Sequence, residues 1–169
     1  MEPQEPQEPQ ELQAAAAAAA ADAFATVSAD TLDYFSFEGA TVACKVLSAY
    51  DGDTVSVAFR WLGVMVRWRV RVAGVDTPEL RGGTPELRAL ATKAKHFVVA
   101  ACVGEQLQLT CHKFDSFGRI IATLTFPNGD TLAQRLIREN LGVPYDDRKR
   151  LMPILARWWA AKKIGMESE

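Results

Sequence analysis

Residues 41–73 decide the fold, and they read TVACKVLSAY, DGD, TVSVAFR, WLG and VMVRWRVRVA in succession. Apolar and polar side chains alternate in 41–50 and 54–60, and β-branched residues are frequent, which is typical of half-buried strands. Between them, Asp51-Gly52-Asp53 predicts a tight turn. The third segment places arginines on one face and apolar side chains on the other: Arg67, Arg69 and Arg71 against Trp68, Val70 and Val72. The stretch therefore predicts three consecutive antiparallel strands.

Further along the chain, Thr84-Pro85-Glu86 has the pattern of a helix start, with an N-cap, a proline in the first turn and an acid that favours the helix dipole. The helix should run to about residue 103 and end at Gly104. Two more strands are predicted at 106–113 and 119–126, and two more helices at 130–140 and 148–164. This order predicts an α+β fold: a five-stranded OB-fold β-barrel with about three α-helices. The alternative is another small α+β sheet with helices on one face.

Residues 1–40 differ in composition from the rest. They contain three Glu-Pro-Gln triplets, a run of eight alanines, eight acidic residues and no Lys or Arg. Such a segment cannot bury enough apolar surface to offset its ordering entropy, so we expect a disordered arm over 1–40 and a domain over 41–165. Phe35 and Phe37 are expected to attach the end of the arm to the domain. All 19 basic residues lie beyond residue 40, against 13 acids, which favours a polyanionic partner for the domain.

The remaining composition excludes several classes of protein. The chain has 169 residues, of which 49% are hydrophobic, and no convincing membrane span, so a soluble globular domain without membrane contact is expected. The N-terminus lacks the basic and leucine-rich regions of a secretory signal. Cys44, Cys102 and Cys111 match no disulfide or metal spacing, which indicates a reducing compartment. We therefore expect an intracellular protein, cytoplasmic or nuclear.

Three short motifs follow strands, and each has a simple structural explanation. Asp51-Gly52-Asp53-Thr54 fits a hairpin turn, and Asp76-Thr77-Pro78-Glu79 fits a helix capping box. Asp115-Ser116-Phe117-Gly118-Arg119 fits a loop that precedes a strand. Taken together in this order and spacing, with Arg71 five residues before Asp76, the motifs resemble the staphylococcal nuclease (thermonuclease) family over residues 42–145. The resemblance implies a Ca²⁺-dependent nuclease that hydrolyses DNA and RNA to 3′-phosphate products.

The resemblance also implies a role for individual residues. Asp53, Asp76 and the backbone carbonyl of Thr77 would bind Ca²⁺, which prefers hard oxygen ligands, and Asp51 would orient the metal site or its waters. Glu79 matches the general base that activates water. The two arginines of the motifs, Arg71 and Arg119, match the groups that clamp the scissile phosphate and stabilise the transition state. Phe117 and Tyr145 are candidates for stacking on the nucleotide.

The chain departs from the family pattern at Ser116-Phe117, where a lysine and a tyrosine often stand. Phe117 can still stack on a base, because stacking needs an aromatic face and no hydroxyl. The competing hypothesis is a catalytically silent OB-fold module that binds nucleic acid. Such a module would have lost some of the five principal site residues, and all are present: Asp53, Arg71, Asp76, Glu79 and Arg119. DNA or RNA is the expected partner of a monomeric chain, and no protein partner is implied.

The sequence Thr-Pro-Glu-Leu-Arg occurs twice, at 77–81 and at 84–88. An aspartate precedes the first copy alone, so we assign Glu79 to catalysis and Glu86 to the helix start. Glu79→Gln should therefore lower kcat by about 10²-fold or more. Glu86→Gln should change the free energy of unfolding by about 0.5 kcal/mol and leave kcat unchanged. Steady-state hydrolysis rates of both variants check the assignment, and equal losses of kcat would contradict it.

Overall fold

The computed structural model describes residues 14, 17, 24–25 and 27–145. The chain divides into two compact units, Met1–Phe35 and Ser36–Glu169. In the first unit, the Ser28 N–H donates to Thr31 Oγ1 at 2.9 Å and the Thr31 N–H donates to the Ser28 carbonyl at 3.1 Å, which closes a short turn. Most of the arm lies outside the described residues, as does the helix expected at 148–164.

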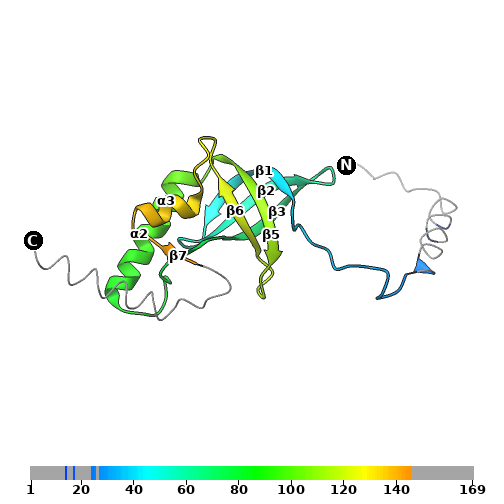
Figure 1. Ribbon diagram of the computed structural model, residues 1–169, viewed down its shortest axis with the longest axis horizontal. Helices are drawn as coiled ribbons and strands as arrows, with labels where there is room; N and C mark the ends of the chain where they lie inside the picture. The colour runs from blue at the N-terminus through cyan, green and yellow to red at the C-terminus, as the bar shows by residue number, and fades with distance from the viewer. Residues whose placement is uncertain (1–13, 15–16, 18–23, 26, 146–169) are drawn as a thin grey trace, which may run out of the picture. The chain divides into compact units, whose positions relative to one another are not determined.

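Five strands of the second unit form a closed barrel in the order β1-β2-β3-β6-β5 (Figure 1). The strands are β1 (Thr41–Ala49), β2 (Thr54–Trp61), β3 (Val64–Val72), β5 (Gln106–Phe114) and β6 (Ile120–Thr125). Neighbouring strands are antiparallel except β3 and β6, which run parallel with Arg71 opposite Ile121. This barrel, with helices beside it, confirms the predicted α+β OB-like fold.

Two strands contain irregularities of register that help to close the barrel. Strand β1 pairs with β5 through residues 41–45 and with β2 through residues 44–49, and its register shifts between Val46 and Ser48. Strand β5 has a similar shift between Cys111 and Phe114 in its pairing with β6. Bulges of this kind bend a strand and increase its twist, which favours the closure of a barrel.

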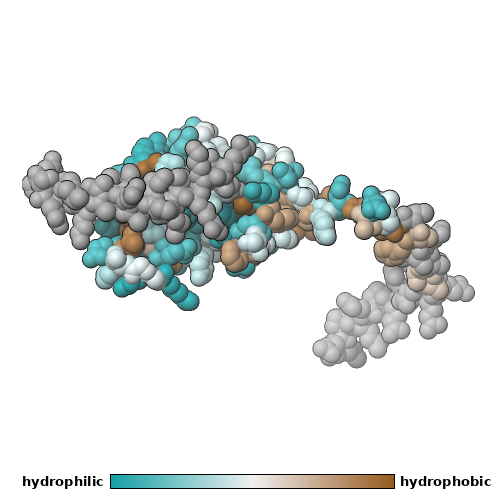
Figure 2. All heavy atoms as spheres, turned by 60° about the horizontal axis from the view of Figure 1, so that its bottom comes forward, coloured by the Kyte–Doolittle hydropathy of each residue, from teal (hydrophilic) through white to brown (hydrophobic). Residues whose placement is uncertain are grey.

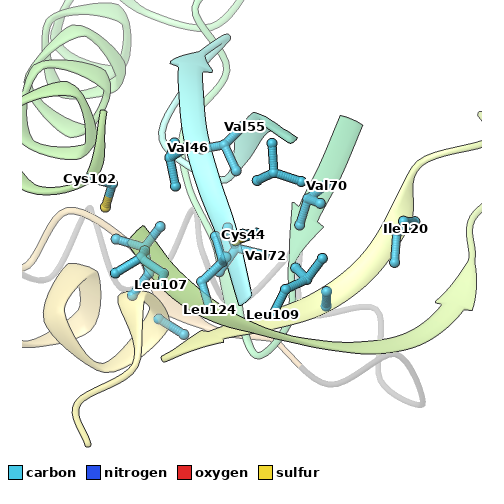
Figure 3. Packing of buried hydrophobic residues seen from close by; sticks show 14 of the residues in the cluster. Cys44, Val46, Val55, Val70, Val72, Cys102, Leu107, Leu109, Ile120 and Leu124 are labelled. Atoms are coloured by element: carbon cyan, nitrogen blue, oxygen red, sulfur yellow. The ribbon is translucent and has the colours of Figure 1, made fainter. Parts of the chain in front are cut away.

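The barrel interior is filled by the inward-facing residues of every strand (Figure 3). These side chains are almost fully buried, and they are Cys44, Val46, Val55, Val57, Phe59, Val70, Val72, Leu107, Leu109, Cys111, Ile120, Ala122 and Leu124. The alternation seen in the sequence therefore matches the pleat of the strands. Burial raises the pKa of the Cys44 and Cys102 thiols to about 11, so both stay protonated and act as small apolar groups.

A cluster of aromatic rings surrounds Phe37, which is 3% exposed. Its ring makes edge contacts with Phe59, Trp61, Trp68 and Phe114, with centroids 5.0–5.7 Å apart. Edge-to-face pairs of this kind contribute beyond the area that they bury. Of the two phenylalanines expected to attach the arm, Phe37 thus belongs to the core of the barrel, whereas Phe35 is 57% exposed.

Helices α2 (Pro85–Cys102) and α3 (Leu132–Arg138) lie at one end of the barrel (Figure 1). Helix α2 begins at Thr84, whose Oγ1 accepts the Leu87 N–H at 3.3 Å, and its buried face includes Ala94 and Val98. Helix α3 is shorter than predicted and begins with a capping box. The structure adds two short strands that the sequence did not predict, β4 (Val75–Asp76) and β7 (Val143–Pro144), which pair with each other.

The surface mixes hydrophilic and hydrophobic residues on the face seen in Figure 2. Large exposed apolar side chains include Leu62, Val64 and Met65 around the β2–β3 turn, and Phe117 in the β5–β6 turn. Neither α2 nor α3 has the length and hydrophobicity needed to cross a membrane.

Phe37→Ala should lower the free energy of unfolding by about 3–5 kcal/mol, because it removes a buried ring and leaves a cavity among four aromatic neighbours. Phe117→Ala is the matched control: the same atoms are removed from a side chain that is 75% exposed, and we expect a change below about 1 kcal/mol. Urea unfolding followed by tryptophan fluorescence measures both values. Similar losses from the two variants would show that Phe37 is not part of the core.

Candidate active site

Asp53 lies directly before β2 and connects two distant segments of the chain. Its Oδ2 accepts the Thr77 N–H at 2.9 Å and the Thr77 hydroxyl at 3.0 Å. The same oxygen lies 2.9 Å from Arg71 Nη1. Asp53 is 7% exposed, so these contacts are shielded from bulk water. Two of the predicted metal ligands and one predicted phosphate clamp are therefore in direct contact.

Asp51 organises the β1–β2 loop. Its Oδ1 accepts the Asp53 N–H at 3.1 Å and the Thr54 N–H at 2.7 Å. The segment is the predicted hairpin turn between β1 and β2, and it is not of type I′, because Gly52 lacks the positive φ that such a turn requires. Burial, together with the nearby charge of Asp53, raises the pKa of Asp51 to about 6.

Arg71 also forms an ion pair with Asp76. Its Nη2 lies 2.7 Å from Asp76 Oδ1, and its Nη1 donates to the Val75 carbonyl at 2.9 Å. The capping-box interpretation of residues 76–79 is wrong, because the next helix begins at Pro85 and the Asp76 carboxylate accepts from Arg71. Burial raises the pKa of Asp76. The charge of Arg71 acts to lower this pKa, and the charges of Asp53 and Glu79 act to raise it, so that the pKa is raised on balance.

Glu79 is exposed and makes no hydrogen bond or ion pair with the described part of the chain. Its charge contributes to the raised pKa values of Asp51 and Asp76, so it lies within electrostatic range of both. Four carboxylates thus influence one another here: Asp51, Asp53, Asp76 and Glu79. Of these, Asp53 and Asp76 pair with Arg71, and the other two form no ion pair within the described residues. This local excess of negative charge would be lowered by a bound cation.

The donors present suit a hard divalent cation in charge and in chemistry. The carboxylates of Asp53 and Asp76 and the carbonyl of Thr77 would offer oxygen atoms as ligands, and among the described residues no cysteine or histidine forms a metal-binding group with them. Within the described ranges, no three acidic, histidine or cysteine side chains converge on one point. A cation bound here would therefore depend on backbone oxygen and water as well as on the two aspartates.

Arg119 is fixed by the turn between β5 and β6. Its Nε lies 2.6 Å from Asp115 Oδ2, and its Nη1 donates to Thr54 Oγ1 at 2.9 Å. Oδ1 of Asp115 accepts the N–H groups of Phe117 and Arg119, both at 2.9 Å. Although burial acts to raise the pKa of Asp115, its hydrogen bonds to Arg119 and the Arg119 charge outweigh this, and the pKa is lowered.

The sequence interpretation missed the positioning roles of Asp115 and Thr54. Thr54 contacts both parts of the site, since its Oγ1 accepts from Arg119 and lies 3.3 Å from Asp53 Oδ1. An acid four residues before an arginine, across a turn, was the available signal for Asp115. The contact between Thr54 and Arg119 had no comparable signal, because the two residues are 65 positions apart in the sequence.

A cavity of about 610 Å³ brings the two arginines together with the two candidate stacking residues. Arg71, Phe117, Arg119 and Tyr145 all line it. The Arg71 guanidinium carbon lies 5.4 Å from the Tyr145 ring centroid, and that of Arg119 lies 5.6 Å from the Phe117 ring. Both distances are within the range of cation–π attraction. The cavity thus combines two fixed cations with two aromatic faces, which suits an anionic aromatic ligand.

A family model described as staphylococcal nuclease homologue matches residues 69–160, more than half of the chain. Arg71, Asp76, Glu79 and Arg119 lie inside the matched segment, and Asp53 precedes it. No curated protein matches the chain.

Asp115→Asn should keep the hydrogen bonds to the backbone and lose the ion pair with Arg119. Because the folded-state pKa of Asp115 is lowered, its charge stabilises the fold above the unfolded-state pKa, and this contribution disappears as the pH falls through the folded-state value. We expect Asp115→Asn to cost about 1–2 kcal/mol at pH 7 and markedly less at a pH below the folded-state pKa of Asp115. Urea unfolding at both pH values measures the difference; a cost that does not change with pH would contradict the ion pair.

Proposed function

The chain belongs to the family of staphylococcal nuclease homologues, and from this premise we propose that it is a Ca²⁺-dependent nuclease that hydrolyses phosphodiester bonds of DNA and RNA to 3′-phosphate products. The observation that supports this most strongly is the cavity shared by Arg71 and Arg119. Two guanidinium groups, each held by carboxylates, face a space that also has aromatic walls. A phosphodiester with its attached base has the complementary chemistry.

Arg71 and Arg119 would bind the non-bridging oxygens of the scissile phosphate. Their planar forks match phosphate geometry, and a five-coordinate transition state carries more negative charge than the ground state, so their contacts strengthen as the reaction proceeds. Asp53, Asp76, Asp115 and Thr54 fix both side chains before substrate binds. This preorganisation reduces the cost of reorienting charged groups during the reaction.

Glu79 is our candidate for the general base. Among the four carboxylates it is the one that is exposed and free of hydrogen bonds with described residues, so its oxygens are available to take a proton from a water molecule. Asp51, Asp53 and Asp76 instead accept hydrogen bonds from their neighbours. This difference in hydrogen bonding is consistent with one reacting carboxylate, Glu79, and three aspartates that hold the site together.

Asp53, Asp76 and the Thr77 carbonyl would hold Ca²⁺, and Asp51 would keep the loop that carries Asp53 in place. When bound, the ion supplies positive charge next to the phosphate and favours deprotonation of water. Phe117 and Tyr145 would stack on the nucleotide base within the cavity. The silent nucleic-acid-binding module is the alternative, and the two hypotheses differ in hydrolysis and not in binding.

Digestion of plasmid DNA and of RNA with Ca²⁺, and again with EDTA, tests the proposal. We expect cleavage with Ca²⁺ that EDTA abolishes. Arg119→Lys keeps the charge but loses the fork, so it should lower kcat by about 10²-fold with less effect on KM. Arg138→Lys is the control, since Arg138 is exposed and contacts Asp130 away from the cavity.

Calcium titration by calorimetry provides a measurement independent of activity. Asp53→Asn and Asp76→Asn should each weaken Ca²⁺ binding by more than about tenfold, because each removes a charged ligand. Hydrolysis that proceeds unchanged in EDTA would contradict the metal site, and binding of nucleic acid without any hydrolysis would favour the silent module.

A further inference from the structure

A second cavity, of about 660 Å³, lies beside the candidate active site, and we call it the basic groove. It is formed by the end of β1, the first half of β2, the middle of β3 and one residue of α2. Its polar lining includes Ser48, Tyr50, Ser56, Arg67, Arg69 and Lys95. None of the roles assigned above uses these residues.

The charge of the basic groove is of one sign. Three cations line it, and no carboxylate is among its lining residues. Arg69 and Lys95 form no ion pair within the described part of the chain, and Arg67 Nε donates to Ser56 Oγ at 2.9 Å, which fixes that guanidinium over the strands. Cations gathered without compensating acids attract an anion, and the hydroxyl groups add hydrogen bonds that suit phosphate oxygens.

The basic groove adjoins the candidate active site. Thr54 lines the groove, and its Oγ1 accepts the hydrogen bond from Arg119. Gly118 also lines it and directly precedes Arg119. Along β3, Arg67, Arg69 and Arg71 share one face, so successive guanidinium stems start about 6.6 Å apart. The first two line the groove and the third lines the active-site cavity, which makes one row of cations across both.

Tyr50 gives the basic groove an aromatic wall. Its side chain is 62% exposed at the end of β1 and makes no hydrogen bond with the described residues. Large exposed aromatic rings beside cations are the usual platform for bases of single-stranded nucleic acid, because every base has a face that can stack. A duplex would keep its bases paired and away from such a ring.

We propose that the basic groove binds the continuation of a single-stranded substrate beyond the scissile phosphate. Arg67, Arg69 and Lys95 contact its phosphates, and Tyr50 stacks on one of its bases. This role rests on the nuclease function proposed above, since it extends the same strand out of the active-site cavity. It makes the protein selective for chains of several nucleotides over single nucleotides.

Fluorescence anisotropy with a labelled twelve-nucleotide single strand tests the basic groove. All measurements use the full chain with Glu79→Gln added, and the integrity of the strand is checked on gels. The triple variant R67Q/R69Q/K95Q should weaken binding by more than about tenfold and reduce the slope of log Kd against log salt by about 2, because three phosphate contacts are lost. Tyr50→Ala should weaken binding by about tenfold without changing that slope.

The matched control is the triple variant K45Q/R60Q/K93Q, which removes three exposed cations that do not line the basic groove. It should change the Kd by less than about threefold, since exposed charges far from the ligand are screened. A nucleoside 3′,5′-bisphosphate has no further nucleotides to extend into the basic groove, so the groove variant should bind it as the parent does. Equal effects of the two triple variants on the strand would overturn the proposal.

Hydrolysis by the chain with Glu79 intact separates this proposal from the nuclease function. The groove variant should raise KM for the twelve-nucleotide strand and leave kcat/KM for a dinucleotide unchanged. An active enzyme whose KM for the long strand is unaffected would overturn the basic groove alone. Conversely, groove-dependent strand binding in a chain that never hydrolyses any substrate would overturn the nuclease function and support the groove.

Discussion

The buried carboxylate of Asp53 holds together the parts of the chain that form the site. One oxygen accepts from the Thr77 amide, the Thr77 hydroxyl and the Arg71 guanidinium, so the β1–β2 loop, the end of β3 and the segment after β4 meet at a single atom. Three donors compensate the cost of burying the charge. Without that oxygen, the Thr77 amide would lose its acceptor at low exposure, and Arg71 would keep only Asp76 as a carboxylate partner.

Two glycines allow the surrounding backbone to approach closely enough for these contacts. A Cβ on Gly52 would lie 2.8 Å from both Ala94 Cβ and Thr77 Oγ1, and a Cβ on Gly142 would lie 2.6 Å from Val75 Cγ2. Neither position needs a left-handed conformation. Their requirement is space: the loop that carries Asp53 lies against helix α2 and Thr77, and the segment before β7 lies against β4. Close packing therefore sets the residue type at both places.

The longer strands and helices were predictable because their apolar residues recur at the spacing of a strand or a helix. In barrel strands such as β3, polar and apolar side chains alternate over much of the strand, and Thr84 and Pro85 predict the start of α2. Strands β4 and β7 are two residues long and carry no pattern, so the contact between Tyr145 and Arg71 that depends on them could not be derived from spacing. The principal site residues were predicted from the resemblance of the motifs to a family. The contacts that connect Asp115 through Arg119 to Thr54 could not be predicted in this way, because they depend on the closed barrel.

The parallel pairing of β3 with β6 has a consequence for how the site arises. Arg71 and Ile121 are 50 positions apart along the chain, and the hydrogen bond from Arg119 to Thr54 spans 65. Contacts between such distant positions form after the entropy of closing long loops has been overcome, and they slow folding. The arrangement of both arginines is therefore a property of the completed barrel. A nascent or half-folded chain lacks it, so the contacts of both arginines should form in the last, slowest phase of refolding rather than with secondary structure.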